Sequence, residues 1–172
     1  MNDQRQEKQA ARRVKKPRPV RDCALYLLER SDKTAGEMRQ KLREREYQPE
    51  EIEETKAFLE EYHYVDDREY VRKYIRTYSS RKSIRRIRAE LEQKGVDEEL
   101  IDAEMAVMPV DEEAQIVQWL RKKGYEPGEP VEWGQYRRLT AALGRRGYSY
   151  EAIRRATERM HEEQEDRLLA EG

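Results

Sequence analysis

Three stretches of the chain align with one another without gaps, and this internal repeat constrains the fold more than any other feature. Each stretch has an apolar residue four positions before a leucine, then a turn, then an isoleucine ten positions after that leucine. The aligned pairs are Leu42 with Ile52, Leu91 with Ile101, and Leu143 with Ile153. The spacings of 49 and 52 residues fit three helices per repeat and a solenoid-like array.

The composition supports a thin, helical architecture. Charged residues make up 42% of the chain and apolar residues 36%, against about a quarter and nearly half in an average domain. A compact sphere lacks the surface for so many charges, whereas an elongated array offers more surface per residue. Glycine and proline are few and phenylalanine occurs once, which favours helices. We therefore predict an all-α fold of three tandem three-helix repeats in an elongated, curved, monomeric array.

The boundaries of the repeats follow from helix start and stop signals. A basic flexible tail is expected over 1–20, followed by repeats over 21–63, 64–108 and 109–172, and the acidic C-terminal end of the last repeat is expected to fray. Thr34 with Glu37 has the spacing of a capping box, and Asp66 with Glu69 has the same spacing. Gly95 is the stop signal of the middle helix of the second repeat.

That middle helix carries an apolar stripe and many arginines. Ile84, Ile87 and Leu91 lie on one side of a helix and are predicted to face the core. The basic residues are predicted to lie at the surface, and Arg88 has helical spacing for an ion pair with Glu92.

Charge alternates in blocks along the chain. Counting lysine and arginine against aspartate and glutamate gives +6 over residues 1–21, −6 over 29–67, +7 over 68–94, −8 over 97–132 and +5 over 133–160. Such blocks are most often solvated helix faces, but a basic block also suits an anionic partner. The predicted contacts to an anionic partner such as nucleic acid are Arg72, Lys73, Arg76, Arg81, Lys82, Arg85, Arg86, Arg88, Arg145 and Arg146. If the basic helix of the second repeat does not make the contact, the alternative site is Arg137, Arg138, Arg145 and Arg146, or the N-terminal tail.

Catalytic and cofactor-binding patterns are absent from the sequence. Cys23 is the single cysteine, and His63 and His161 lack ligand spacing. The pair Asp66-Asp67 is better explained as a helix cap than as a metal site. No apolar run is long enough to span a membrane. We expect a soluble, cytoplasmic protein that is not an enzyme and needs no cofactor.

Three motifs follow one another in a specific order and spacing: Thr34, Glu37-Met38 and Lys41-Leu42, then Tyr64-Val65-Asp66-Asp67 with Tyr70, then Ile87-Arg88, Glu90-Leu91 and Lys94-Gly95-Val96. In these residues the chain resembles the RecX family of RecA regulators. The sequence departs from the family at Glu46 and His63, where a turn glycine is usual, and at Ser83, where a glycine often precedes the basic helix.

The resemblance implies three tandem three-helix repeats, no cofactor, and binding to the RecA–DNA filament with restraint of its recombinase and coprotease activities. The implied partners are the filament and the phosphates of single- and double-stranded DNA. Two alternatives stay open: a direct DNA-binding regulator and a helical-repeat adaptor between proteins. The arginines lack the Asn and Gln partners typical of base recognition, which favours phosphate contacts.

Overall fold

The protein is entirely helical over the residues that the structure, a computed structural model, describes: 18–125, 127 and 133–171. The helices are α2 (Val20–Arg30), α3 (Ala35–Arg43), α4 (Pro49–Glu61), α5 (Asp67–Tyr78), α6 (Ile84–Gln93), α7 (Glu98–Val107), α8 (Glu112–Lys122), α9 (Trp133–Arg145) and α10 (Tyr150–Glu171). The predicted all-α class is confirmed. The predicted basic tail lies almost wholly outside the described residues.

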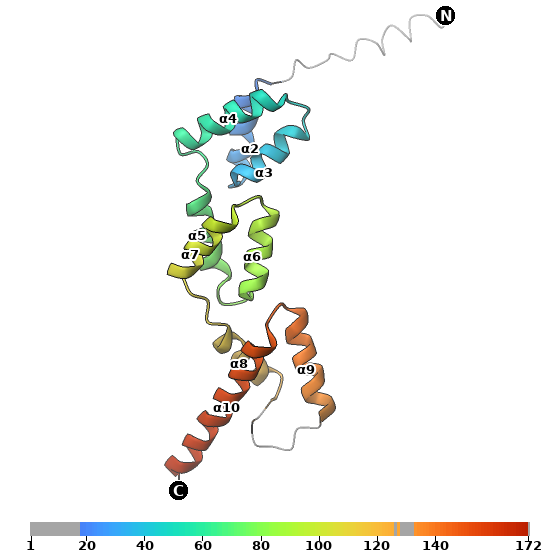
Figure 1. Cartoon of the computed structure of the whole chain (residues 1–172), viewed down its shortest axis with the longest axis vertical. Coiled ribbons are helices and arrows are strands. Elements are labelled where there is room, and N and C mark those ends of the chain that lie inside the picture. The colour runs from blue at the N-terminus through green and yellow to red at the C-terminus, as the bar shows by residue number, and fades with distance from the viewer. Residues whose placement is uncertain (1–17, 126, 128–132, 172) are drawn as a thin grey trace, which may run out of the picture.

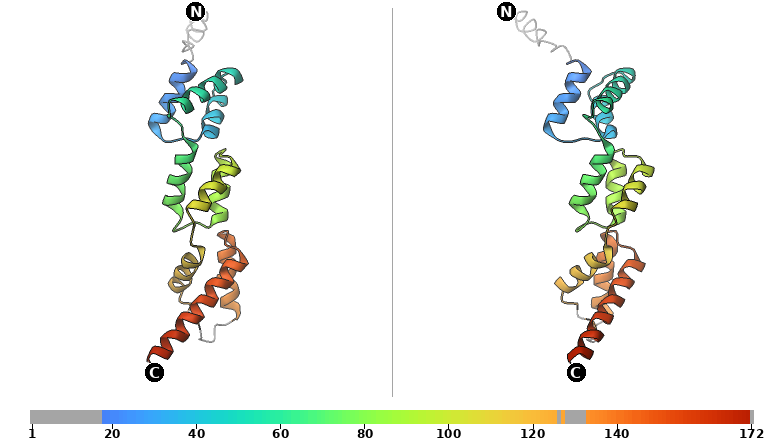
Figure 2. Two further views of the ribbon diagram at one scale, coloured as in Figure 1. Left: turned by 60° about the vertical axis from the view of Figure 1, so that its left-hand side comes forward. Right: turned by 90° about the vertical axis from the view of Figure 1, so that its left-hand side faces the viewer.

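Three units of three helices follow one another along the long axis (Figures 1 and 2). We call α2–α4 unit 1, α5–α7 unit 2 and α8–α10 unit 3. Each unit has a hydrophobic core of its own. The protein is therefore an elongated stack of small domains, which accommodates its high charge content, and the predicted series of three three-helix repeats is confirmed.

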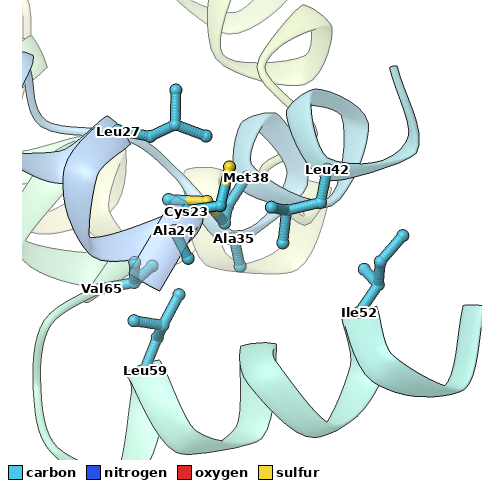
Figure 3. Close-up of a cluster of buried hydrophobic side chains, with 9 residues drawn as sticks. All are labelled: Cys23, Ala24, Leu27, Ala35, Met38, Leu42, Ile52, Leu59 and Val65. Atoms are coloured by element: carbon cyan, nitrogen blue, oxygen red, sulfur yellow. The ribbon is translucent and has the colours of Figure 1, made fainter. Parts of the chain in front are cut away.

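The core of unit 1 shows why the repeat pattern folds in this way (Figure 3). Leu42 from α3 and Ile52 from α4 point into a cluster that also contains Cys23 from α2. The aligned leucines of all three units are fully buried, and the aligned isoleucines are 0–3% exposed. The sequence repeat is thus a repeat of core positions, because each helix must bury its apolar stripe against the other two.

The helix starts are capped as predicted. The Thr34 hydroxyl accepts the backbone N–H of Glu37, and the Glu37 carboxylate accepts the backbone N–H of Thr34, which completes the capping box. The Asp66 carboxylate accepts the backbone N–H of Glu69. Ser83, where the family often has glycine, caps α6 by accepting the backbone N–H of Arg86 at 3.2 Å.

The middle helix of each unit ends in the same left-handed turn. Its residue has φ of 63° at Glu46, 75° at Gly95 and 93° at Gly147. In each unit the next residue donates its N–H to the carbonyl of the aligned leucine, as Val96 does to Leu91 at 3.2 Å. Glu46 therefore adopts a conformation that favours glycine, and so does His63, with φ of 55°.

We expect the Glu46→Gly variant to be more stable than the wild type by up to about 1 kcal/mol. A residue with a Cβ in the left-handed region costs about 1–2 kcal/mol, and glycine avoids this cost. Glycine also loses more conformational entropy on folding than glutamate does, which offsets part of the gain in stability. Glu50→Gly is the matched control, because Glu50 is exposed in the first turn of α4 and glycine in a helix costs about 1 kcal/mol. Urea unfolding measures both, and equal destabilisation of the two variants would contradict the prediction.

One prediction about packing is wrong. Ile84 is 37% exposed, because it is the first residue of α6 and its Cβ tilts toward the helix N-terminus, beyond the core centred on Ile87 and Leu91. At the C-terminal end, α10 continues as a helix to Glu171, and the fraying of this end stays a prediction. Its continuation past Arg159 is supported by Glu163, which pairs with Arg159 at 3.0 Å and with Arg121 of α8 at 2.6 Å.

The junction between units 1 and 2 brings the start of α3 against the end of α6. The buried Thr34 hydroxyl donates to the carbonyl of Lys94, and the Asp67 carboxylate accepts the backbone N–H of Ala35 at 2.8 Å. Burial raises the pKa of Asp67, and the bond from Ala35 opposes that shift. Unit 2 therefore completes the cap of a helix that belongs to unit 1.

The junction between units 2 and 3 repeats these contacts one unit further along. The buried Ser83 hydroxyl donates to the carbonyl of Arg146 at 3.1 Å, and the Glu112 carboxylate accepts the backbone N–H of Ile84 at 2.8 Å. Ser83 aligns with Thr34 in the repeat, and Glu112, like Asp67, is the first residue of its helix. As a result α3, α6 and α9 are stacked end to end (Figure 1).

None of the helices within the described ranges combines the length and the apolar character needed to cross a membrane.

Candidate nucleic-acid interface

The predicted basic residues on α5 are engaged by carboxylates. Arg72 Nε lies 2.7 Å from a carboxylate oxygen of Glu104, whose side chain is 2% exposed. Lys73 pairs with Asp32 of unit 1, and Arg76 pairs with Glu69 of its own helix at 2.7 Å. The pKa of Arg72 is raised by the hydrogen bond to Glu104, and that of Lys73 by the hydrogen bond to Asp32. Each of these three residues would have to give up or share an ion pair in order to contact a phosphate.

A second group of predicted residues converges on Glu90. Lys82 Nζ lies 2.5 Å from one Glu90 oxygen, Arg86 Nε lies 2.9 Å from the other, and the Tyr74 hydroxyl also donates to this carboxylate. Burial acts to raise the pKa of Glu90, but the hydrogen bonds from Lys82, Tyr74 and Arg86 outweigh it and lower the pKa to about 2. The Lys82 side chain is 19% exposed, so the expectation that it lies freely at the surface is wrong.

Arg88 also differs from the prediction. It pairs with Asp102 and, at 3.6 Å, with Glu98 of α7 rather than with Glu92 of its own helix. Arg88 pairs with α7 instead of its own helix because α7 packs beside α6 and places the carboxylates of Glu98 and Asp102 within reach.

Four predicted residues keep guanidinium groups with no carboxylate partner among the described residues. Arg85 and Arg145 are exposed on α6 and α9. Arg81 donates to the carbonyl of Thr77 at 3.3 Å, and the Arg146 guanidinium lies 4.9 Å from the centre of the Trp119 ring. Among the predicted residues, the arginines without an ion pair in the described part of the chain therefore lie around the start of α6 and at the end of α9.

The outer side of α9 carries two further arginines, Arg137 and Arg138, which belong only to the alternative site predicted from the sequence. Arg137, Arg138 and Arg145 border an open surface depression of about 600 Å³, together with Gly134 and Ala141. At about 100° per residue, these positions lie opposite the buried face of the helix. The spacing of the arginines was a usable signal in the sequence, because it is the polar stripe of an amphipathic helix.

The repeat relates this stripe to α6. Alignment of Ile87 with Leu139 places Arg85 and Arg86 at the positions of Arg137 and Arg138. Unit 1 has Gly36 and Glu37 at those positions. We use the name arginine face for five residues of α6 and α9, which are Arg85, Arg86, Arg137, Arg138 and Arg145. It runs along two stacked helices, and Arg86 is its only member in an ion pair within the described part of the chain.

The arginine face can bind an extended row of anionic groups. Guanidinium groups match phosphate oxygens in geometry and form charge-assisted hydrogen bonds with them. In the described part of the chain, no cluster of three or more His, Cys, Asp or Glu side chains is placed to hold a metal ion. The fold is that of a helical-repeat protein, and this surface carries arginines whose chemistry suits anionic partners.

Comparison with known proteins identifies the family to which the chain belongs. Family models match all three units: the first three-helix domain of RecX over residues 21–59, the second over 66–105 and the third over 111–157. These matches cover more than half of the chain. The chain therefore belongs to the RecX family of regulatory proteins.

Relatives and solved structures agree with this assignment. The chain is 34% identical over 139 residues to the regulatory protein RecX of Vibrio vulnificus, covering 79% of this chain and 89% of the relative. It is 28% identical over 137 residues to the RecX of Clostridium botulinum strain Eklund 17B, covering 78% of this chain and 65% of that longer relative. A crystal structure of RecX from Lactobacillus salivarius superposes with a TM-score of 0.71 at 21% identity, covering 82% of this chain and 94% of that one, which supports the fold.

Proposed function

We propose that this protein binds the nucleoprotein filament that RecA forms on DNA and restrains the recombinase and coprotease activities of RecA. The arginine face carries the proposal, because it offers five guanidinium groups along two stacked helices, and phosphates recur regularly along a DNA strand. The protein acts as a monomer, without a cofactor or a reaction of its own. It contacts single- or double-stranded DNA through phosphates.

The charge of unit 1 favours a filament over bare DNA as the partner. The exposed glutamates of α4 are Glu50, Glu51, Glu53, Glu54, Glu60 and Glu61. Naked DNA repels such a surface, whereas a filament also presents protein to which an acidic helix can dock. An elongated molecule with an arginine face on units 2 and 3 and an acidic helix on unit 1 fits a partner that contains both components.

The test is a titration of this protein into RecA assembled on DNA, with ATPase and strand exchange as readouts. We expect inhibition by the wild type, and affinity for the filament above that for RecA alone or for DNA alone. The triple variant Arg137→Gln, Arg138→Gln and Arg145→Gln should bind more weakly. Its log–log salt slope should fall by about 0.7–0.9 for each phosphate that the variant no longer binds, or about 2–3 in total.

A matched control removes three arginines that are already paired. Arg121, Arg154 and Arg159 belong to the same unit and each pairs with a glutamate. Their replacement by glutamine removes the same total charge, so we expect a smaller change in slope. Equal losses of affinity in the two triple variants would show that net charge, rather than the arginine face, controls binding. Equal wild-type affinity for naked DNA and for filament would favour a direct DNA-binding regulator instead.

A further inference from the structure

The two junctions between units are built alike but differ in charge. At the first junction, Lys94 Nζ at the end of α6 lies 2.7 Å from the Glu37 carboxylate in the first turn of α3. The repeat places Arg146 at the position of Lys94 and Arg86 at the position of Glu37. An ion pair at one junction is therefore replaced by two arginines at the other.

The segments that carry Arg86 and Arg146 lie next to each other at the second junction. A Cβ placed on Gly147 would lie 3.8 Å from both the Cβ and the backbone nitrogen of Arg86. The Ser83 hydroxyl joins the same two segments through its bond to the Arg146 carbonyl. Two long arginine side chains that begin this close together can bring both guanidinium groups to a single anion.

The carboxylates near the second junction are committed elsewhere. Glu112 accepts the backbone N–H of Ile84, and it forms no ion pair with any described residue. Glu90 is shared among Lys82, Tyr74 and Arg86. Arg146 rests on the Trp119 ring and, within the described ranges, has no carboxylate partner. The junction therefore has cationic donors in excess of its acceptors, and the repulsion between them favours an added anion.

We propose that the junction between units 2 and 3 binds one phosphate group of a nucleic-acid strand, bridged by Arg86 and Arg146, where the first junction has the Glu37–Lys94 ion pair. The inference rests on the proposed function, since it locates one of its phosphate contacts. A bridging phosphate also ties α6 to α9. The relative orientation of units 2 and 3 then becomes dependent on nucleic acid, whereas that of units 1 and 2 is fixed within the chain.

The test is a double-mutant cycle with Arg86→Gln, Arg146→Gln and the double variant. Binding of a fluorescent oligothymidylate is followed by anisotropy over a series of salt concentrations. If both arginines hold one phosphate, the log–log slope of the double variant should fall by about 0.7, the value for one phosphate of a single strand, and its reduction in affinity should be smaller than the sum of the single reductions. Additive reductions with a slope change of about 1.4, or no reduction, would overturn the inference.

Arg86→Glu provides a second arm because it restores the charge pattern of the first junction. This variant should fold as the wild type does, by circular dichroism, and should weaken oligothymidylate binding more strongly than Arg86→Gln does. Arg43→Glu is the control, since Arg43 is exposed on α3 of unit 1 and has no ion pair among the described residues. Equal effects of the two charge reversals would contradict a site at the junction.

The outcome for the inference is separable from that for the proposed function. If the wild type binds and inhibits the RecA filament but the cycle is additive, the inference fails alone. If the wild type does not bind the filament, the proposed function fails, and the oligothymidylate cycle still decides whether the junction holds a phosphate. A wild type that binds no oligothymidylate at any salt concentration would overturn the inference.

Discussion

Replacing Gly95 with alanine should lower the free energy of unfolding by about 2–5 kcal/mol, the sum of two separate costs. Gly95 has φ of 75°, and a residue with a Cβ in this region costs about 1–2 kcal/mol. A Cβ on Gly95 would also lie 2.8 Å from the Cα of Gly36 across the junction between units 1 and 2. Overpacking of this kind costs about 1–3 kcal/mol, because backbone cannot move aside as a flexible side chain can.

Two further glycines separate the costs. Gly36→Ala carries the steric cost, since its Cβ would lie 2.6 Å from the Cα of Gly95 and 2.8 Å from the carbonyl of Lys94. Because Gly36 lies in α3, the better helix propensity of alanine offsets up to about 1 kcal/mol of that cost. Gly124→Ala carries only the conformational cost, because its φ is 71° and its Cβ would meet nothing within 4 Å. Urea unfolding of the three variants should rank Gly95→Ala as the most destabilised. A Gly36→Ala variant as stable as the wild type would show that the junction yields without cost.

Replacing Leu91 with alanine should cost about 2–5 kcal/mol, the range for removing a fully buried leucine from a close-packed core. Leu91 is 0% exposed and packs with Ile75 and Ile87 in the core of unit 2. Leu169→Ala is the control, because Leu169 is 81% exposed on α10 and surface changes stay within about 0.5 kcal/mol. The free energy of unfolding in urea measures both.

Because unit 2 lies between the other two units, a core variant of unit 2 should affect hydrogen exchange differently from a core variant of unit 3. Units in such an array contact only their neighbours, so unfolding of the central unit removes both junctions, whereas unfolding of unit 3 removes one. Hydrogen exchange should therefore show reduced protection in all three units of Leu91→Ala. In Leu143→Ala the reduction should be concentrated in unit 3. Identical exchange patterns would mean that the array unfolds as one cooperative block.

The two junctions indicate how a chain of small domains can be both stable and adjustable. Each unit has a small core, and the following unit supplies a cap to a helix of unit 1 and to a helix of unit 2. The first junction is fixed by an ion pair inside the chain, while the second presents two arginines. A regulator that lies along a helical filament would benefit from one rigid and one ligand-dependent connection, which is what the proposed phosphate site provides.

The fold class, the number of repeats and most helix starts could be predicted from the amino-acid sequence. These features depend on local chemistry: the apolar stripe with its period of 3.6 residues, the cap hydroxyls and carboxylates, and the left-handed turn after each aligned leucine. Glu46 and His63 were recognised as departures at turn positions, and their positive φ values explain why glycine is usual there.

Which basic residues are free depends on the tertiary structure and could not be predicted in this way. In sequence Arg72, Lys73 and Arg88 look like Arg85, yet their carboxylate partners Glu104, Asp32 and Asp102 lie 32, 41 and 14 positions away. Ion pairing depends on distances of a few ångströms between side chains of different helices, and no local pattern specifies these distances. For the same reason, the stacking of α3, α6 and α9, and with it the proximity of the segments that carry Arg86 and Arg146, depends on how the units are placed end to end.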